Sequence, residues 1–236
     1  MINTMLGTKL GMTQVFPGIG EVIPVTVLKV GPCVVVQKKS LANDGYNALQ
    51  LGYGQKREKL INKAMQGHLK KANLTSTKYL QEVRIDNTDE YQPGDKLGIN
   101  MFKKGDYVDI KGVSKGKGMA GVIKRHHFKG GKMSHGCDNK RGPGSVGASS
   151  YPSRVFKGTR MAGRMGGDTV KVMKLEVVEV RENENLLLVK GAVPGPRNGF
   201  VVISKTNRYV KVKIEKKAEV KDNKETKKES KKKEKS

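Results

Sequence analysis

Short runs of apolar residues, separated by turn signals, dominate the chain outside its middle section. The runs are rich in valine, isoleucine and leucine, and glycine, proline or aspartate residues lie between them. Short strands with regular turn signals are typical of a closed β-barrel or a β-sandwich. The expected strands cover residues 21–30, 33–39, 47–54, 96–102, 107–114, 169–180, 185–193 and 199–205.

One segment has helical periodicity instead. In residues 57–73, apolar residues recur at intervals of three and four from Leu60 onward, which places them on one face of a helix. Gly67 lies within this segment and lowers its helix propensity by about 1 kcal/mol relative to alanine. We therefore expect a single mainly β domain over residues 1–210, interrupted by a small helical insertion over residues 57–95.

Residues 211–236 differ from the rest of the chain in composition. Lys and Glu dominate this tail, and apolar residues are almost absent from it. Such a segment cannot bury enough surface to offset the entropy lost on ordering, so we expect it to be disordered. A solvated appendage is its simplest role, and a weak contact with RNA or a neighbouring protein is the alternative.

The charge of the protein indicates a polyanionic partner. The formal net charge is +25, from 47 Lys and Arg against 22 Asp and Glu. Nucleic acid is the leading candidate, and an anionic membrane surface is the alternative. The sequence has no apolar run of about 18 residues, the length that predicts a transmembrane helix, and no secretory signal is recognised. Two distant cysteines, Cys33 and Cys137, fit a reducing cytoplasm.

Residues 114–165 hold a large share of this charge. The segment contains twelve Lys or Arg residues and one acidic residue, Asp138. It also keeps apolar residues such as Met119 and Ile123, more than a solvated linker, the simplest alternative, requires. Because self-repulsion opposes collapse, we predict a long extended basic loop that takes its shape from the phosphates it contacts.

The candidate contacts in this loop follow from their chemistry. Lys and Arg neutralise phosphates, and His can donate hydrogen bonds to phosphate or sugar. Phe128, Tyr151 and Phe156 are suited to stacking on unpaired bases. The candidate RNA-contacting residues are Lys115, Lys117, Lys124, Arg125, His126, His127, Lys129, Lys132, His135, Lys140, Arg141, Arg154, Lys157, Arg160 and Arg164.

The segment GKGMAG at residues 116–121 matches the G-x-G-x-x-G fingerprint of dinucleotide-binding loops. That fingerprint requires a following helix within alternating helix and strand units. Here Gly130 and Gly131 interrupt the next segment early, and alternating units are not evident. Close approach of one backbone segment to another, or to phosphate, explains these glycines better than a nucleotide site does.

Other chemistries have weaker support. His126, His127, His135 and Cys137 lack the paired spacings of structural zinc sites. The serines of the loop lack a G-x-S-x-G elbow. We therefore expect a non-enzymatic protein without metal, cofactor or small-molecule substrate. A peripheral membrane protein would need an amphipathic helix that the glycine density opposes, and a free GTP-dependent translation factor would need a G-x-x-x-x-G-K-[ST] loop.

Several motifs resemble one known family. They include the blocks LGTKLGMTQVF near the N-terminus, RVFKGTRMAGRMGG at 154–167 and NLLLVKGAVPGPRNG at 185–199. The chain resembles the bacterial form of ribosomal protein L3 of the large subunit over about residues 1–205. The signature positions that match are Phe102, Asp109, Gly112, Ser114, Gly116, Lys117, Gly118, Gly121 and Arg125.

This resemblance implies a six-stranded barrel of the translation-protein type that carries the loop 114–165. It implies cytoplasmic large subunits, contacts with large-subunit rRNA and neighbouring ribosomal proteins, and a role in early assembly. In the family, the loop runs inward toward the peptidyl transferase centre. Some bacterial relatives have a methylated glutamine where this chain has Ser150, so that modification is not expected. The implied tip comprises Gly142, Pro143, Gly144, Ser145, Val146, Gly147, Ala148, Ser149, Ser150, Tyr151, Pro152 and Ser153.

Overall fold

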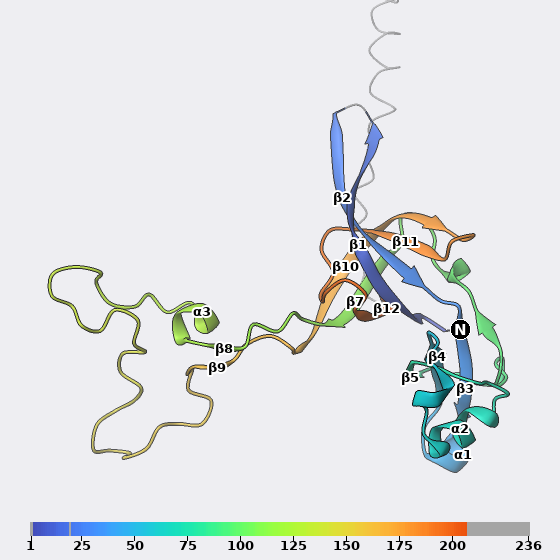
Figure 1. The fold of residues 1–236 in the computed structure, drawn as a ribbon, viewed down its shortest axis with the longest axis horizontal. Coiled ribbons are helices and arrows are strands. Elements are labelled where there is room, and N and C mark those ends of the chain that lie inside the picture. The colour runs from blue at the N-terminus through green and yellow to red at the C-terminus, as the bar shows by residue number, and fades with distance from the viewer. Residues whose placement is uncertain (1, 19, 207–236) are drawn as a thin grey trace, which may run out of the picture. The chain divides into compact units, whose positions relative to one another are not determined.

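The secondary structure of the protein is mainly β. The computed structural model describes residues 2–18 and 20–206 (Figure 1). Within these residues it contains twelve strands, three short α-helices and two 3-10 turns. This confirms the expected fold class. The tail 211–236, predicted to be disordered, lies outside the described residues.

Six strands close into a barrel, and each is antiparallel to its neighbours. Alternate side chains point inward, so Met5, Leu28, Ile110, Leu187 and Ile203 are fully buried in one core. Burying each such side chain contributes about 1.5–3 kcal/mol. In order around the barrel the strands are β1 (Thr4–Gly18), β12 (Phe200–Lys205), β7 (Tyr107–Val113), β10 (Thr169–Arg181), β11 (Leu186–Lys190) and β2 (Glu21–Val30).

Strand β1 was not among the strands expected from the sequence, because glycine and polar residues interrupt its apolar pattern. Gly7 is required where β1 pairs with β2 at Val30: a Cβ atom there would lie 2.6 Å from the carbonyl oxygen of Lys29. Glycine thus permits close packing of the two strands, although it weakens the strand signal in the sequence.

A second sheet of four strands packs against the barrel. Its inward side chains, among them Val35, Leu49 and Leu51, belong to the same buried cluster as the barrel core. The strands expected at 33–39 and 47–54 are confirmed, but they build this sheet instead of the barrel. The order is β5 (Tyr79–Arg84), β4 (Ala48–Tyr53), β3 (Cys33–Lys39) and β6 (Lys96–Leu97).

The helical elements are shorter than the sequence suggested. The helix expected over residues 57–73 is a 3-10 turn, η1 (Glu58–Leu60), followed by α2 (Lys63–Lys70). Helix α2 begins at its N-cap Asn62, whose Oδ1 accepts a hydrogen bond from the Met65 amide at 2.9 Å. A further one-turn helix, α1 (Leu41–Asp44), joins β3 to β4.

The strand expected at 96–102 is wrong beyond Leu97. After β6, residues Ile99–Met101 form a 3-10 turn, η2, in which the Phe102 amide donates to the Ile99 carbonyl. The turn buries both Ile99 and Phe102 in the core, so tertiary packing overrides the local strand pattern.

Candidate nucleic-acid interface

The basic loop begins where β7 ends and returns to the barrel at β10 (Figure 1). Its two sides are hydrogen-bonded to each other near the barrel. The Lys117 amide donates to the Met165 carbonyl at 2.8 Å, and the Met165 amide donates to the Gly118 carbonyl at 2.9 Å. The pairing continues through β8 (Met119–Ala120) and β9 (Gly163–Arg164). Residues 114–120 and 163–168 thus form a two-stranded stalk.

Glycines allow the two sides of the stalk to approach each other. Gly166 has a φ of +74°, and a Cβ atom there would overlap the carbonyl oxygen of Lys115. Within GKGMAG, Gly118 has a φ of +67°, a left-handed conformation that glycine adopts readily. Strand β8 and a helix of only five residues follow, so the architecture differs from that of a dinucleotide-binding loop.

A short helix, α3 (Val122–His126), fixes the far end of the stalk. Arg125 Nη1 donates to the Met161 carbonyl at 2.9 Å, and His126 Nε2 donates to the same oxygen at 3.2 Å. The Arg125 guanidinium lies so close to Gly163 that a Cβ atom there would overlap it. Two predicted RNA contacts therefore also hold the loop together, which their sequence positions did not indicate.

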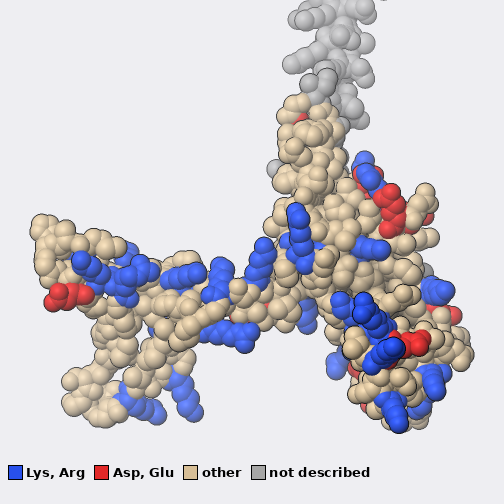
Figure 2. All heavy atoms as spheres, in the orientation of Figure 1, with Lys and Arg blue, Asp and Glu red and all other residues tan. Residues whose placement is uncertain are grey.

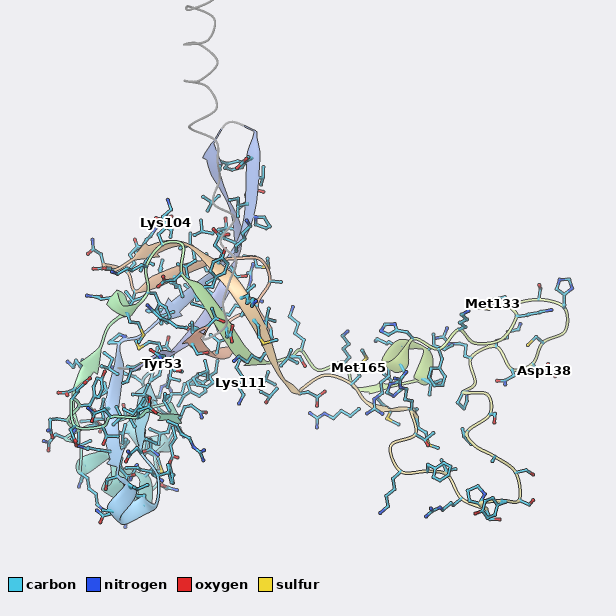
Figure 3. All side chains as sticks on the ribbon, turned by 180° about the vertical axis from the view of Figure 1, so that it is seen from behind. Tyr53, Lys104, Lys111, Met133, Asp138 and Met165 are labelled. Carbon is cyan, nitrogen blue, oxygen red and sulfur yellow. The ribbon has the colours of Figure 1, made fainter. Side chains whose placement is uncertain are left out.

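Beyond α3 the chain forms two lobes. The first, residues 128–142, contains the labelled Met133 and Asp138 (Figure 3). It is closed by a hydrogen bond from the Gly131 amide to the Lys140 carbonyl at 3.2 Å. A Cβ atom on Gly131 would overlap the Asn139 carbonyl, so this closure requires glycine.

The second lobe, residues 143–160, contains nearly all of the predicted tip. Its hydrogen bonds are local: Thr159 Oγ1 donates to the Phe156 carbonyl at 2.7 Å, and Ser145 Oγ donates to the Gly147 carbonyl at 3.1 Å. Residues 143–153 contain no charged side chain, whereas Arg141 and Arg154 flank them. The lobe therefore presents a neutral end between cationic sides.

The cations of the loop form no ion pairs within the part of the chain that the structure describes. Among residues 2–18 and 20–206, none of its twelve Lys and Arg side chains forms an ion pair, since every ion pair there lies in the barrel or the second sheet. All of these residues except the half-buried Arg125 are exposed. Figure 2 shows Lys and Arg along the stalk and in both lobes.

The aromatic residues of the loop differ in their exposure to solvent. Tyr151 is 89 % exposed and Phe156 is 58 % exposed. The Arg154 guanidinium lies 5.6 Å from the centroid of the Phe156 ring. Phe128 is half-buried beside His126, with ring centroids 6.2 Å apart. Tyr151 and Phe156 are therefore the rings most accessible to an unpaired base.

Two charged residues of the barrel, Lys9 and Asp109, lie near the root of the loop, which is the place where the loop leaves β7 and returns to β10. The Lys9 ammonium donates to the carbonyls of Val193 and Gly195 at 2.7 and 3.2 Å, and partial burial together with Lys115 lowers its pKa. Asp109 is buried and pairs with Lys171 at 2.8 Å. Burial acts to raise the pKa of Asp109, but hydrogen bonds from Lys171 and from the Lys174 amide lower it overall.

The histidines and Cys137 of the loop are not brought together as metal ligands. In the part of the chain that the structure describes, no group of three or more His, Cys, Asp or Glu residues is placed to hold a metal ion. A cavity of about 660 Å³ lies elsewhere, where Tyr53 marks the junction of barrel and second sheet (Figure 3). It is lined by Lys29, Lys78 and Lys96 with hydroxyl and apolar groups.

The helices of the described residues are also too short or too polar to cross a bilayer.

Comparison with known proteins identifies the family. The family model for ribosomal protein L3 matches residues 83–184. Large ribosomal subunit protein uL3 of Heliobacterium modesticaldum is 54 % identical over 199 residues, covering 84 % of this chain and 94 % of its own length. The chain belongs to the ribosomal protein L3 family. Proteins of the same name from Syntrophotalea carbinolica and Carboxydothermus hydrogenoformans are 52 % and 50 % identical over 209 and 203 residues. They cover 88 % and 86 % of this chain, and the alignments include 100 % and 97 % of their own lengths.

In this L3 family member, the signature residues build the root and stalk of the loop. Phe102 is buried in the core, and Asp109 holds β7 against β10. Gly112 lies where a Cβ atom would come 3.2 Å from the Pro194 carbonyl, and Arg125 bonds the far side of the loop. Membership of a ribosomal protein family also confirms the expectation that the protein is not an enzyme.

Proposed function

We propose that this protein is a structural constituent of the cytoplasmic large ribosomal subunit and binds large-subunit rRNA directly through the loop 114–165. The observation that carries the proposal is the set of cations along the stalk and both lobes, nearly all exposed, which have no carboxylate partner among the described residues. The relatives are named large ribosomal subunit proteins, which supports this setting.

The mechanism is electrostatic and coupled to folding. Each Lys or Arg that neutralises a phosphate releases condensed counterions, which favours binding and makes it depend on salt. Arginine adds a bidentate fork suited to phosphate oxygens. The lobes have few hydrogen bonds of their own, so RNA contacts supply the interactions that fix their shape.

The neutral end of the second lobe lies between the cations Arg141 and Arg154. We place residues 142–153 toward the peptidyl transferase centre, with Arg141 and Arg154 contacting phosphates on either side. The barrel anchors the loop from one end, and its early binding assists folding of the rRNA during subunit assembly. Neighbouring ribosomal proteins complete its surroundings.

Sucrose-gradient sedimentation of tagged protein tests this proposal. Three chains are expressed in bacterial cells: the full chain, a chain in which a short Gly-Ser turn replaces residues 122–162, and a control lacking residues 211–236. After a high-salt wash, the full chain and the control should remain with the large subunit. The loop-shortened chain should move to the soluble fraction, because it has lost most of its phosphate contacts.

Ultraviolet cross-linking then distinguishes RNA contact from mere incorporation. Irradiated subunits should yield peptides containing Tyr151 or Phe156 attached to large-subunit rRNA. Release of the full chain by the wash would overturn the proposed function. Retention of the loop-shortened chain at the full level, without loop cross-links, would overturn the role of the loop.

A further inference from the structure

The connection between β11 and β12, residues 191–199, packs against the root of the loop. A Cβ atom on Gly112 would come 3.2 Å from the Pro194 carbonyl oxygen, and one on Gly195 would come 3.0 Å from the Val113 carbonyl oxygen. Both Gly112 and Val113 lie at the end of β7, where the loop begins. The connection therefore lies directly against the point where the loop leaves the barrel.

Lys9 of β1 binds this connection through both its backbone and its side chain. Its amide donates to the Gly199 carbonyl at 3.0 Å, and its carbonyl accepts from the Asn198 amide at 2.7 Å. Its ammonium donates to the Val193 and Gly195 carbonyls. An ammonium has three N–H donors, so the third has no protein partner in the part of the chain that the structure describes. Lys9 is thus held in place at the root with one donor left for a ligand.

Lys115, the first cation of the loop, lies close enough to Lys9 to act on its charge. Partial burial and, after it, the positive charge of Lys115 lower the pKa of the Lys9 ammonium. Neither lysine forms an ion pair among residues 2–18 and 20–206, and neither does Asp168, an acidic residue at the root. Since like charges at short range repel, an anion between Lys9 and Lys115 would stabilise the charged form of both.

A purely structural role for Lys9 explains only part of this arrangement. Its bonds to two carbonyls fix the connection, but a neutral donor could make the same bonds without repulsion from Lys115. A phosphate accounts for the charge as well, because its oxygens can accept charge-assisted hydrogen bonds from two cations at once. Because the two carbonyls already hold the Lys9 ammonium, binding a phosphate costs little further side-chain entropy.

We infer that Lys9 and Lys115 bind a single RNA phosphate between them at the root of the loop. The inference rests on the proposed function, which supplies RNA as the ligand, and it adds a residue of the barrel to the RNA-binding surface. The sequence did not single out Lys9, because it lies far outside the cationic segment 114–165. One phosphate held by both lysines fixes the barrel and the start of the loop at the same point of the RNA.

Filter binding over a salt series tests whether one phosphate is shared. The full chain, Lys9→Gln, Lys115→Gln and the double variant are each bound to large-subunit rRNA freed of protein. Each single change should lower affinity about two- to fivefold, the range of an exposed ion pair, with a nearly unchanged salt slope, because the other lysine still neutralises the phosphate. The double variant should lose about 0.7 from the slope, the value for one phosphate, whereas two separate contacts would lose about 1.4.

Two further variants separate charge from structure. Lys9→Arg in the Lys115→Gln background should keep the wild-type slope, because arginine restores the charge; a role of Lys9 limited to the fold would not produce this rescue. Lys104→Gln removes an exposed cation near the start of β7, at the opposite end of the strand from the root (Figure 3). Its effect should be the same with and without Lys9→Gln. Urea unfolding of each free variant checks that all of them are folded in the binding assay.

Other outcomes separate the inference from the proposed function. An unchanged slope in the double variant would overturn the inference and leave Lys9 with a structural role. A loss of about 1.4 would show two separate phosphates, and a loss of about 0.7 in Lys115→Gln alone would assign the phosphate to Lys115, so either result would overturn the shared site. In these cases the wild-type chain still binds rRNA with a steep salt dependence. Absent or salt-independent binding by the wild-type chain would overturn the proposed function itself.

Discussion

The barrel and the loop of this molecule differ in whether their charged side chains form ion pairs. In the barrel, carboxylates pair with nearby lysines, as in Asp109 with Lys171 at 2.8 Å and Asp106 with Lys205 at 3.1 Å. In the loop, the described Lys and Arg side chains have no carboxylate partner. The barrel thus contains carboxylate partners for some of its lysines, whereas the loop has one acidic residue, Asp138, and no ion pair among the described residues.

The two regions differ equally in how they bury apolar surface. The barrel packs fully buried residues such as Ile110 and Leu187 into one core. In the loop, Met119, Met133 and Phe156 stay exposed, and burial is confined to Ala120 and Val122 beside α3. Because burial is the main favourable term in folding, the barrel should be stable alone and the lobes should not.

Hydrogen exchange of the RNA-free protein should show the largest contrast. Core amides such as those of Ile110 and Leu187 should exchange only on global unfolding, at about 5–15 kcal/mol. Amides of residues 125–160 should exchange with opening free energies near zero. In assembled large subunits the loop amides should become protected, as measured by mass spectrometry.

The stalk provides an internal reference for this experiment. The Lys117 and Met165 amides are hydrogen-bonded across it and should show intermediate protection. Core-like protection of residues 125–160 without RNA would mean that the loop stabilises itself, and the dependence on external charge would then be wrong.

Removing loop charges should cause the next largest effect. The change of Lys129, Lys132, Lys140 and Arg141 to Gln removes four exposed cations from the first lobe. Each phosphate contact contributes about 0.7 to the slope of log affinity against log salt for single-stranded RNA. If all four residues contact phosphate, the slope should fall by about 3, and affinity in 0.1 M salt should fall on the order of 10²–10³-fold.

A matched variant controls for net charge. Changing Lys56, Lys59, Lys63 and Lys71 to Gln removes four exposed cations near α2 and leaves the loop intact. Filter binding over a salt series should show a much smaller change of slope for this variant. Equal slopes for the two variants would indicate general attraction to the whole protein instead of contact by the loop.

The sequence predicted the barrel better than it predicted the division between the two sheets. Valine-rich strands such as 21–30 and 199–205 are visible because alternate positions are buried. Which sheet a strand joins depends on distant pairings, such as Met5 with Ile203, and no local pattern encodes these. Strand β1 was missed because Gly7 and Gly11 interrupt it, although close packing requires glycine at Gly7.

The loop shows a related limit. The cations of the loop were evident from composition alone, because Lys and Arg side chains can be read from the sequence without knowing their neighbours in the fold. The stalk was not predicted, since it joins segments about fifty residues apart through glycine-rich backbone. The bond from Arg125 to Met161 likewise spans 36 residues. The added role of Arg125 therefore became visible only in three dimensions.

The ion pair between Asp109 and Lys171 tests whether internal pairing of charges stabilises the barrel. Asp109→Asn removes the pairing with Lys171 and weakens the hydrogen bond from the Lys174 amide. Since hydrogen bonds to charged groups contribute about 1.5–3 kcal/mol and Lys171 is half exposed, we expect a loss of about 1–2 kcal/mol. Urea unfolding of the free protein measures this loss.

The pH dependence of this pair has a definite sign. Because the folded protein lowers the pKa of Asp109, its stabilisation is complete above the unfolded pKa, near 3.8, and is lost as pH falls through the lower folded value. The difference between wild type and Asp109→Asn should therefore be constant at neutral pH and shrink in acid. A difference that grows in acid would contradict the assignment.

The smallest effect should come from Arg125→Lys, which keeps a positive charge at this position but changes the hydrogen-bonding geometry of the side chain. The positive charge remains, but a lysine lacks the planar fork whose Nη1 bonds the Met161 carbonyl against Gly163. Loss of one such bond weakens the junction by about 0.5–1.5 kcal/mol, so RNA affinity should fall about two- to tenfold with an unchanged salt slope. Arg125→Gln should lower both affinity and slope. If Arg125→Lys and Arg125→Gln lower RNA affinity equally and leave the salt slope unchanged, Arg125 does not contact phosphate and acts only by holding the stalk together.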